Sequence, residues 1–559
     1  MLPRTGGRGV GGSSGLIGHT WTRGLRLQVG YLFQGWVWRF DLSYTPEEDL
    51  ATEPPLDLAT EPPLDLATEP PLDLATEPPL DLATEPPLDL ATDPPLDVST
   101  DTPGLPPPEA PCPFVHPLVV RVSTPKTALR LKLKKLECHF TWGITGSISK
   151  LRWLRDHLED INTDEGYTWL GHIYNLLGFI RYRQGCTDSA VQYLRKAGET
   201  FLQINNTVSE EGPWLLVNYG NLAWMNFHLN NMKASQDYLE KVEAVLRDHP
   251  SPSQEDPLHP EVYAEKAWTL MKFGKAKMAN VIECFQKAIA MEPDRKEWQT
   301  SLVLALNARC TPKMELEILE KLRMAKEVDP ENSYLASVYL LRLAKKQRVG
   351  QDEIQALARR ILSRPCGANS GLAPLLEVYR ICLTQDEAMD LVQEALDRYP
   401  DDRNLKAKLA EFYKRKVFSK EGIHCTKSFI DRGISLFQEV IALYPESCTK
   451  AKLDLASIYA KSGRDGADVI YEELLGRSDL GPDELQMLHF SYAKHLNYYG
   501  RGQDWRDRSI NHHMKVVEIQ KQSKFQSKSV MILSRIVERG LNYRCAEIRD
   551  FLEENSATL

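Results

Sequence analysis

The residues best suited to chemistry in this sequence are two adjacent pairs, His512-His513 and His424-Cys425. Neighbouring side chains on a helix point about 100° apart, so neither pair converges on one metal ion or one substrate atom. The chain also lacks the phosphate loop G-x-x-x-x-G-K-[ST], the zinc motif H-E-x-x-H and the nucleophile motif G-x-S-x-G. We therefore expect no catalytic residue, no metal, no cofactor and no enzymatic activity.

The ten cysteines are scattered, with no C-x-x-C pair and no histidine at zinc-finger spacing. This pattern indicates neither a zinc site nor a disulfide framework. Reduced cysteines are usual in the cytosol, so the sequence predicts a cytoplasmic protein. The apolar segment LQVGYLFQGWVWRF at 27–40 is broken by Gln and Arg and is too short to span a bilayer, so we expect no contact with a membrane.

The acidic net charge of -9 is not spread evenly along the chain. Residues 51–100 hold twelve acidic residues and no basic one, and residues 1–125 together carry -12. The remaining chain is therefore mildly basic, at +3. That charge is too small for a nonspecific nucleic-acid binder, but it leaves room for a local basic groove.

A low-complexity tract begins at Leu50, where the octad LATEPPLD repeats five times before appearing as LATDPPLD from Leu90. Paired prolines favour extended polyproline-like chain, and the sparse apolar surface cannot offset the entropy of ordering. We predict that residues 1–125 form a disordered leader; a spacer or a ligand for proline-recognising domains is the functional alternative. The arginines near the start leave a mitochondrial presequence open, although the Pro-rich acidic block behind them is unlike one.

Residues 126–559 have helical periodicity, with apolar residues three and four apart. A turn of proline followed by an acidic residue recurs as MEPD at 291–294, VDPE at 328–331, RYPD at 398–401 and LYPE at 443–446. A small or branched residue stands five positions before each proline: Ala288, Ala325, Ala395 and Val440. This is the pattern of tetratricopeptide repeats, in which a small residue marks the helix crossing and Pro the end of the second helix.

The predicted fold class is all-α, a superhelical solenoid of tetratricopeptide repeats over residues 126–559. One helix pair cannot bury its apolar face alone, so neighbouring pairs stack, and their first helices line a concave surface. We expect the functional residues to lie on that concave surface. The small and aromatic residues at the repeat positions are interpreted as core.

Four segments carry a more specific resemblance: ECHFTW at 137–142, YNLL at 174–177, YGNLAW at 219–224 and EKAWTLMKFG at 265–274. In this order they resemble the interferon-induced proteins with tetratricopeptide repeats. The resemblance runs from about Leu131 to near Leu541 and excludes the Pro-rich tract. Relative to the longer, RNA-end-binding members, the chain looks shorter by about one repeat.

The resemblance implies an innate antiviral effector whose solenoid closes around a positively charged pocket for the 5′ end of single-stranded RNA. Trp268 matches a tryptophan of the cap-binding part, and Lys272 matches a lysine that faces the terminal phosphates. Both residue types suit these roles, because an indole stacks on a base and an ammonium group pairs with phosphate. Trp268 as a core residue is the alternative.

Other pocket positions depart from the family pattern. Arg309 is displaced by one residue from the expected arginine, and an Arg-Tyr pair expected near Ala373 and Pro374 is absent. Ala407 replaces a histidine and is flanked by Lys406 and Lys408, which are the candidate substitutes. Further basic residues lie on predicted repeat helices, where a solvated helix face or an i,i+4 ion pair with an acid is the alternative role: Arg181, Arg183, Arg342, Lys345, Lys346, Arg380, Lys414, Arg415 and Lys416.

Two functions follow from this resemblance. The leading expectation is that RNA carrying a 5′ triphosphate or a cap binds at Trp268, Lys272, Arg309, Lys406 and Lys408. The alternative is a scaffold that binds related tetratricopeptide-repeat proteins and host factors without binding RNA ends. The displaced arginine and the shorter C-terminus favour the alternative.

Overall fold

The computed structural model describes residues 125–161, 169–204, 212–253, 256–368, 370–419 and 425–555. The expected leader therefore lies outside the described residues, apart from Pro125, and so does His424. The described residues form α-helices and short 3-10 helices and contain no strand. None of the helices in these ranges is long and apolar enough to cross a membrane.

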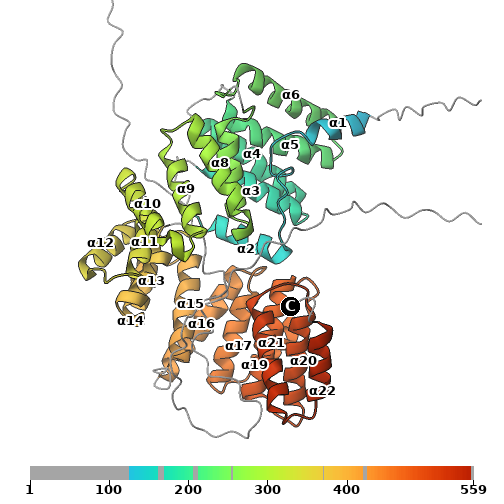
Figure 1. Cartoon of the computed structure of the whole chain (residues 1–559), viewed down its shortest axis with the longest axis vertical. Helices are drawn as coiled ribbons and strands as arrows, with labels where there is room; N and C mark the ends of the chain where they lie inside the picture. The colour runs from blue at the N-terminus through green and yellow to red at the C-terminus, as the bar shows by residue number, and fades with distance from the viewer. Residues whose placement is uncertain are drawn as a thin grey trace, which may run out of the picture.

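The first half of the helical chain forms one group of helices at the top of Figure 1. Its members are α1 (Pro125–Leu133), α2 (Ile148–Glu159), α3 (Leu170–Arg183), α4 (Thr187–Ile204), η2 (Pro213–Leu215), α5 (Leu216–His228), α6 (Met232–Asp248), α7 (Pro260–Met271), η3 (Lys275–Lys277), α8 (Met278–Met291), α9 (Lys296–Ala308), η4 (Pro312–Met314) and α10 (Glu315–Val328).

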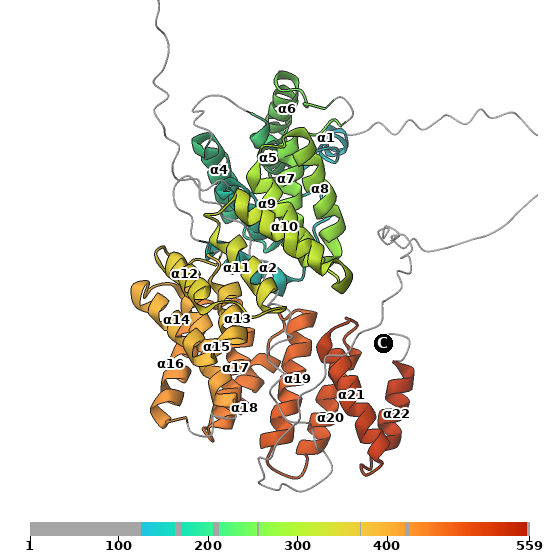
Figure 2. The same ribbon diagram turned by 60° about the vertical axis from the view of Figure 1, so that its left-hand side comes forward.

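The second half continues the chain of helix pairs. It comprises α11 (Ser333–Ala344), α12 (Gln351–Leu362), α13 (Leu372–Cys382), α14 (Gln385–Arg398), α15 (Arg403–Phe418), α16 (Lys427–Leu443), α17 (Thr449–Lys461), α18 (Ala467–Leu475), α19 (Pro482–Tyr499), α20 (Trp505–Glu518), α21 (Lys524–Arg539) and α22 (Cys545–Glu554). Figure 2 shows α11–α14 joining the first group to the stack α15–α22.

The helices pack in consecutive pairs, such as α3 with α4, α7 with α8 and α19 with α20. First helices of successive pairs also contact one another, in the order α3, α5, α7, α9 and again α15, α17, α19, α21. This arrangement confirms the predicted all-helical solenoid of tetratricopeptide repeats.

The four Pro-acid turns all end their helices in the same way. The helices α8, α10, α14 and α16 stop two residues before the proline. In each, the residue before the proline donates the last helical hydrogen bond to the small residue: Glu292 to Ala288, Asp329 to Ala325, Tyr399 to Ala395 and Tyr444 to Val440. Proline has no amide hydrogen to continue the ladder, so the helix ends there.

Close helix crossings depend on the small residues. A Cβ atom on Gly178 would lie 2.7 Å from the side chain of Leu194 in the partner helix α4. Ala190, Leu194 and Ala197 are fully buried against α3. The interpretation of these repeat positions as core is confirmed.

Candidate nucleic-acid interface

Trp268 lies on α7 and is 0% exposed. Its ring is nearly parallel to that of Trp169, at the start of α3, with centroids 6.2 Å apart and an interplanar angle of 14°. His172 lies beside both rings. The indole therefore packs inside the first group of helices, in an aromatic cluster rather than on an open wall.

Lys272 follows the last residue of α7 and is 9% exposed. Its Nζ lies over the Trp268 ring, 5.3 Å from the centroid. Burial, followed by the positive charge of Lys150, places the pKa of the Lys272 ammonium well below its usual value. Since the chain folds with two ammonium groups close together in a region of low dielectric, an anion placed between them would be stabilised.

Lys150 and Trp153, from the first turns of α2, lie on the other side of the Lys272 ammonium group. Lys150 Nζ lies 4.0 Å from the centroid of the Trp153 ring. Trp153 in turn stacks on His157, with centroids 5.2 Å apart and an interplanar angle of 4°. The sequence reasoning missed these residues, although the i, i+3 spacing of a lysine and a tryptophan next to the serine cap at Ser147 is a recognisable signal.

Beneath the aromatic cluster, a chain of buried polar groups connects α3, α5 and α7. Asn218 donates to Asn175 Oδ1 at 2.7 Å, and Asn175 donates to Glu265 Oε1 at 2.9 Å. Burial raises the pKa of Glu265 to about 8 and lowers that of His172 to about 3. Both groups therefore tend to be neutral near pH 7 in this interior, where unpaired charge is costly.

The other predicted pocket residues do not gather around Lys272. Arg309 caps α9 and is exposed. Lys406 pairs with Glu439 of α16 at 3.3 Å, and Lys408 pairs with Glu411 of its own helix at 3.4 Å. Of the predicted set, the structure brings only Trp268 and Lys272 together among the contacts between described residues.

Most of the further basic side chains pair with acids. The ion pairs are Arg181 with Glu159, Arg342 and Lys346 with Glu315, Arg380 and Arg415 with Glu377, Lys414 with Asp454, and Lys416 with Asp386. Arg342 also donates to the Asn307 side chain at 2.7 Å. These partners account for their charge, although only Arg380 and Glu377 lie one turn apart on the same helix, and the other pairs join different helices.

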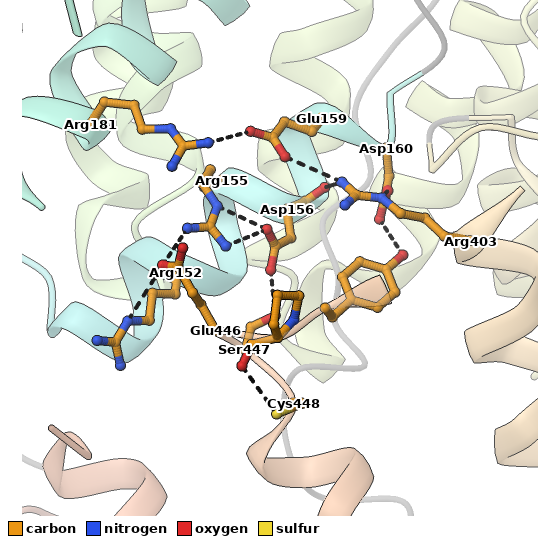
Figure 3. Close-up of polar contacts among 12 residues, drawn as sticks. Arg152, Arg155, Asp156, Glu159, Asp160, Arg181, Arg403, Glu446, Ser447 and Cys448 are labelled. Atoms are coloured by element: carbon orange, nitrogen blue, oxygen red, sulfur yellow. Dashed lines mark hydrogen bonds and ion pairs between the residues drawn. The ribbon is translucent and has the colours of Figure 1, made fainter. Parts of the chain in front are cut away.

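Helix α2 ties the two halves of the solenoid together, as Figure 3 shows. Arg155 donates to Glu446 Oε2 at 2.6 Å, in the turn before α17. At the end of α2, Arg403 donates to Asp160 Oδ1 at 2.5 Å and Tyr444 to Asp160 Oδ2 at 2.8 Å. The segment that carries Lys150 is therefore held by contacts to residues 244 and 291 positions away, Arg403 and Glu446.

The carboxyl group of Asp160 is buried, and its side chain is 8% exposed. Burial raises its pKa to about 6, although Arg403 and Tyr444 act in the opposite direction. Asp156 accepts from both Arg155 nitrogens, at 2.9 and 2.6 Å, and from the Ser447 hydroxyl. This network fixes where the N-terminus of α2 meets the end of α7.

The chain is similar in sequence to known proteins with tetratricopeptide repeats. No protein-family model matches the chain. The Homo sapiens interferon-induced protein with tetratricopeptide repeats 2 is 25% identical over 432 residues, which cover 76% of this chain and 90% of that protein. The Homo sapiens antiviral innate immune response effector IFIT1 is 25% identical over 441 residues, covering 74% and 89%.

The chain is a divergent relative of the interferon-induced proteins with tetratricopeptide repeats. Solved structures support the fold of this relative. The human IFIT1 dimer with PPP-AAAA matches with a TM-score of 0.52 at 22% identity, covering 77% of this chain and 96% of that one. A monomeric mutant of IFIT1 with Gppp-AAAA matches with a TM-score of 0.52 at 21% identity, covering 77% and 100%.

Proposed function

We propose that this relative is an antiviral innate-immunity binding protein, without enzymatic activity, that takes the 5′ end of single-stranded RNA carrying a triphosphate or a cap. The observation that carries the proposal is the pair Lys272 and Lys150. Burial, and after it the positive charge of Lys150, lowers the pKa of Lys272. A 5′ phosphate would supply the negative charge that this place favours.

The aromatic surroundings fit the same ligand. Each lysine lies over an indole, Lys272 over Trp268 and Lys150 over Trp153. The relative IFIT1 has been solved with triphosphate and capped AAAA oligonucleotides. In this chain Trp268 is packed on Trp169, so we propose that it supports the side chain of Lys272 and does not contact the RNA. Trp153, which is partly exposed, would stack on a base instead.

Binding of 5′-triphosphate RNA and of 5′-hydroxyl RNA of the same sequence tests the proposal, with fluorescence anisotropy at fixed salt. We expect tighter binding of the triphosphate RNA, and an affinity for it about tenfold lower in Lys272→Gln and in Lys150→Gln. Lys275→Gln is the matched control, because Lys275 is exposed on the neighbouring η3. Equal weak binding of both RNAs by the parent protein would refute RNA-end recognition.

The ion pairs of Lys406, Lys408 and the other basic residues favour the second candidate function, a scaffold for related tetratricopeptide-repeat proteins and host factors. A pull-down with and without RNase separates the two. Partners that survive RNase support the scaffold, whereas partners that are lost with the RNA support the first proposal. The cytoplasm is the compartment where both functions would operate.

A further inference from the structure

The exposed Tyr, Trp and Phe side chains of the described residues lie around one place, the first turn of α20. Tyr498 and Tyr499, which end α19, are 40% and 39% exposed. Tyr543, in the turn between α21 and α22, is 82% exposed, and its hydroxyl donates to Asp507 Oδ2 of α20 at 2.7 Å. The other rings of these three types in the described ranges are buried or partly buried. Apolar rings left in water at a single place indicate a binding surface.

Trp505, the partly exposed first residue of α20, completes what we call the α19–α20 aromatic patch: Tyr498, Tyr499, Trp505 and Tyr543. A Cβ atom on Gly500 would lie 2.7 Å from the Cβ atom of Trp505, so a glycine is needed for the end of α19 to come this near to the tryptophan. The ring centroids of Tyr498 and Tyr499 are 6.3 Å apart, and that of Tyr499 lies 5.8 Å from the ring of the buried His495. The patch therefore rests on packed side chains on the α19 side.

The charge around the patch is only weakly positive. Residues 498–508 hold three arginines and two aspartates, a net charge of +1. Arg506 Cζ lies 4.9 Å from the centroid of the Trp505 ring, and neither Arg501 nor Arg506 forms an ion pair with a carboxylate of the described residues. A nucleic-acid strand carries a negative charge on every phosphate and binds in grooves with many cations. The balance here instead favours a peptide with few carboxylates and rigid apolar side chains.

Proline pairs with flanking acids have this chemistry. Polyproline segments bind aromatic-lined surfaces, because the chain is extended before it binds and loses little entropy. The chain itself contains six such segments within residues 50–97, EPPLD five times and DPPLD once. In each segment one carboxylate directly precedes the proline pair and a second follows two residues after it.

We infer that the α19–α20 aromatic patch binds the chain's own proline octads, with the proline pairs on the exposed rings and the flanking carboxylates at Arg501 and Arg506. About 30 to 70 residues separate the proline pairs from Pro125, and an extended chain of that length reaches roughly 90–210 Å. The tether gives the octads an effective concentration of up to the order of a millimolar, so weak contacts suffice. This inference is independent of RNA binding at Lys272.

Photocrosslinking within the full chain tests the inference. The substitution Leu80→p-benzoylphenylalanine places a photoreactive group directly after a proline pair. After illumination, mass spectrometry should find most crosslinks in residues 495–508 and 540–547. Crosslinks spread evenly over the helices, or concentrated on another surface, would overturn the inference. Illumination in the presence of isotope-labelled protein without the probe identifies the acceptor chain, and crosslinks mainly to labelled chains would assign the octads to a second copy instead.

A leader variant separates the prolines from the acids. Replacing the twelve prolines of the octads by alanine keeps every carboxylate and leaves the helical sequence intact. Crosslinking to the patch should then fall by about fivefold or more, because the preorganised rings are lost. Crosslinking that persists in this variant would show that the prolines are not recognised.

A matched pair of variants tests the patch itself. Arg501→Gln with Tyr543→Ala should lower octad crosslinking by about fivefold. The control, Arg348→Gln with Leu316→Ala, removes the same charge and another exposed apolar side chain at a distant place, and should leave crosslinking unchanged. A patch variant that loses binding of 5′-hydroxyl RNA while its octad crosslinks persist would assign the patch to RNA and overturn the inference. Loss of triphosphate RNA binding in Lys272→Gln alone would concern only the first proposal.

Discussion

The substitution Arg403→Ala tests whether a buried charged pair holds α2 against α15. Arg403 donates to Asp160 at 2.5 Å, and the Asp160 side chain is 8% exposed. Without the guanidinium, the carboxylate would keep the Tyr444 hydroxyl, a neutral donor at 2.8 Å. Breaking a buried pair from one side costs about 3–5 kcal/mol. Because Arg403 itself is 26% exposed, water can partly replace it, and we expect a loss of about 3 kcal/mol in the free energy of unfolding near neutral pH.

The pH dependence of this loss follows from the state of Asp160. Its pKa in the folded protein is raised to about 6 with Arg403 present, and removal of the positive charge raises it further. In the unfolded chain an aspartate has a pKa of about 4. A protonated carboxyl group needs no counter-charge, so the loss is complete only above the raised pKa of the variant and shrinks as the pH falls from there toward about 6, the pKa in the parent. At about pH 5 the loss should be about 1 kcal/mol.

Urea unfolding followed by tryptophan fluorescence measures the loss at both pH values, and hydrogen exchange shows whether α2 is the helix that loosens. Arg380→Ala is the control, since Arg380 pairs with Glu377 one turn away and is 38% exposed. That change should cost no more than about 0.5 kcal/mol. An Arg403→Ala protein as stable as the control variant, or a loss that does not depend on pH, would refute the reasoning.

Two further substitutions test the interior of the first group of helices. Gly178→Ala places a Cβ atom 2.7 Å from Leu194, so thermal unfolding should show a loss of about 1–3 kcal/mol in the free energy of unfolding. In the double variant with Leu194→Ala, the loss should be smaller than the sum of the two single losses. Glu265→Gln removes a carboxyl group whose folded pKa is about 8, well above that of an unfolded glutamate. Stability of the parent should therefore fall relative to the glutamine variant as the pH rises from about 5 to about 8, by about 3–4 kcal/mol in urea unfolding. A pH-independent difference would contradict the burial argument.

The repeat architecture could be predicted because its determinants are local. The four Pro-acid turns end α8, α10, α14 and α16 at the predicted places, and the small residue before each proline accepts the last helical hydrogen bond. A proline stops a helix in any context, and a glycine at a crossing is needed whatever the neighbouring repeat contains. Such rules require no knowledge of distant residues.

The position of α2 could not be predicted in this way. Its contacts join Asp160 to Arg403 and Arg155 to Glu446, which lie hundreds of residues apart and come from different repeats. In the sequence these residues look like ordinary charges on solvated helix faces. Only the folded solenoid reveals that the side chains of Arg155 and Asp160 are buried and that α2 brings Lys150 near the end of α7.

The predicted binding residues are of two kinds: some are paired with an acid of the adjacent helix, and Lys272 lies near another lysine. Lys272 directly follows α7 and lies over the ring of Trp268, and the charge that affects its pKa is that of another lysine, Lys150. Lys406 stands on α15 opposite Glu439 of α16, so its charge is already matched. Both are lysines on repeat helices, and the sequence window around each does not reveal the difference. The partner supplied by the adjacent helix therefore decides which basic residue is matched by a carboxylate, as Lys406 is by Glu439, and which lies near another positive charge, as Lys272 does near Lys150.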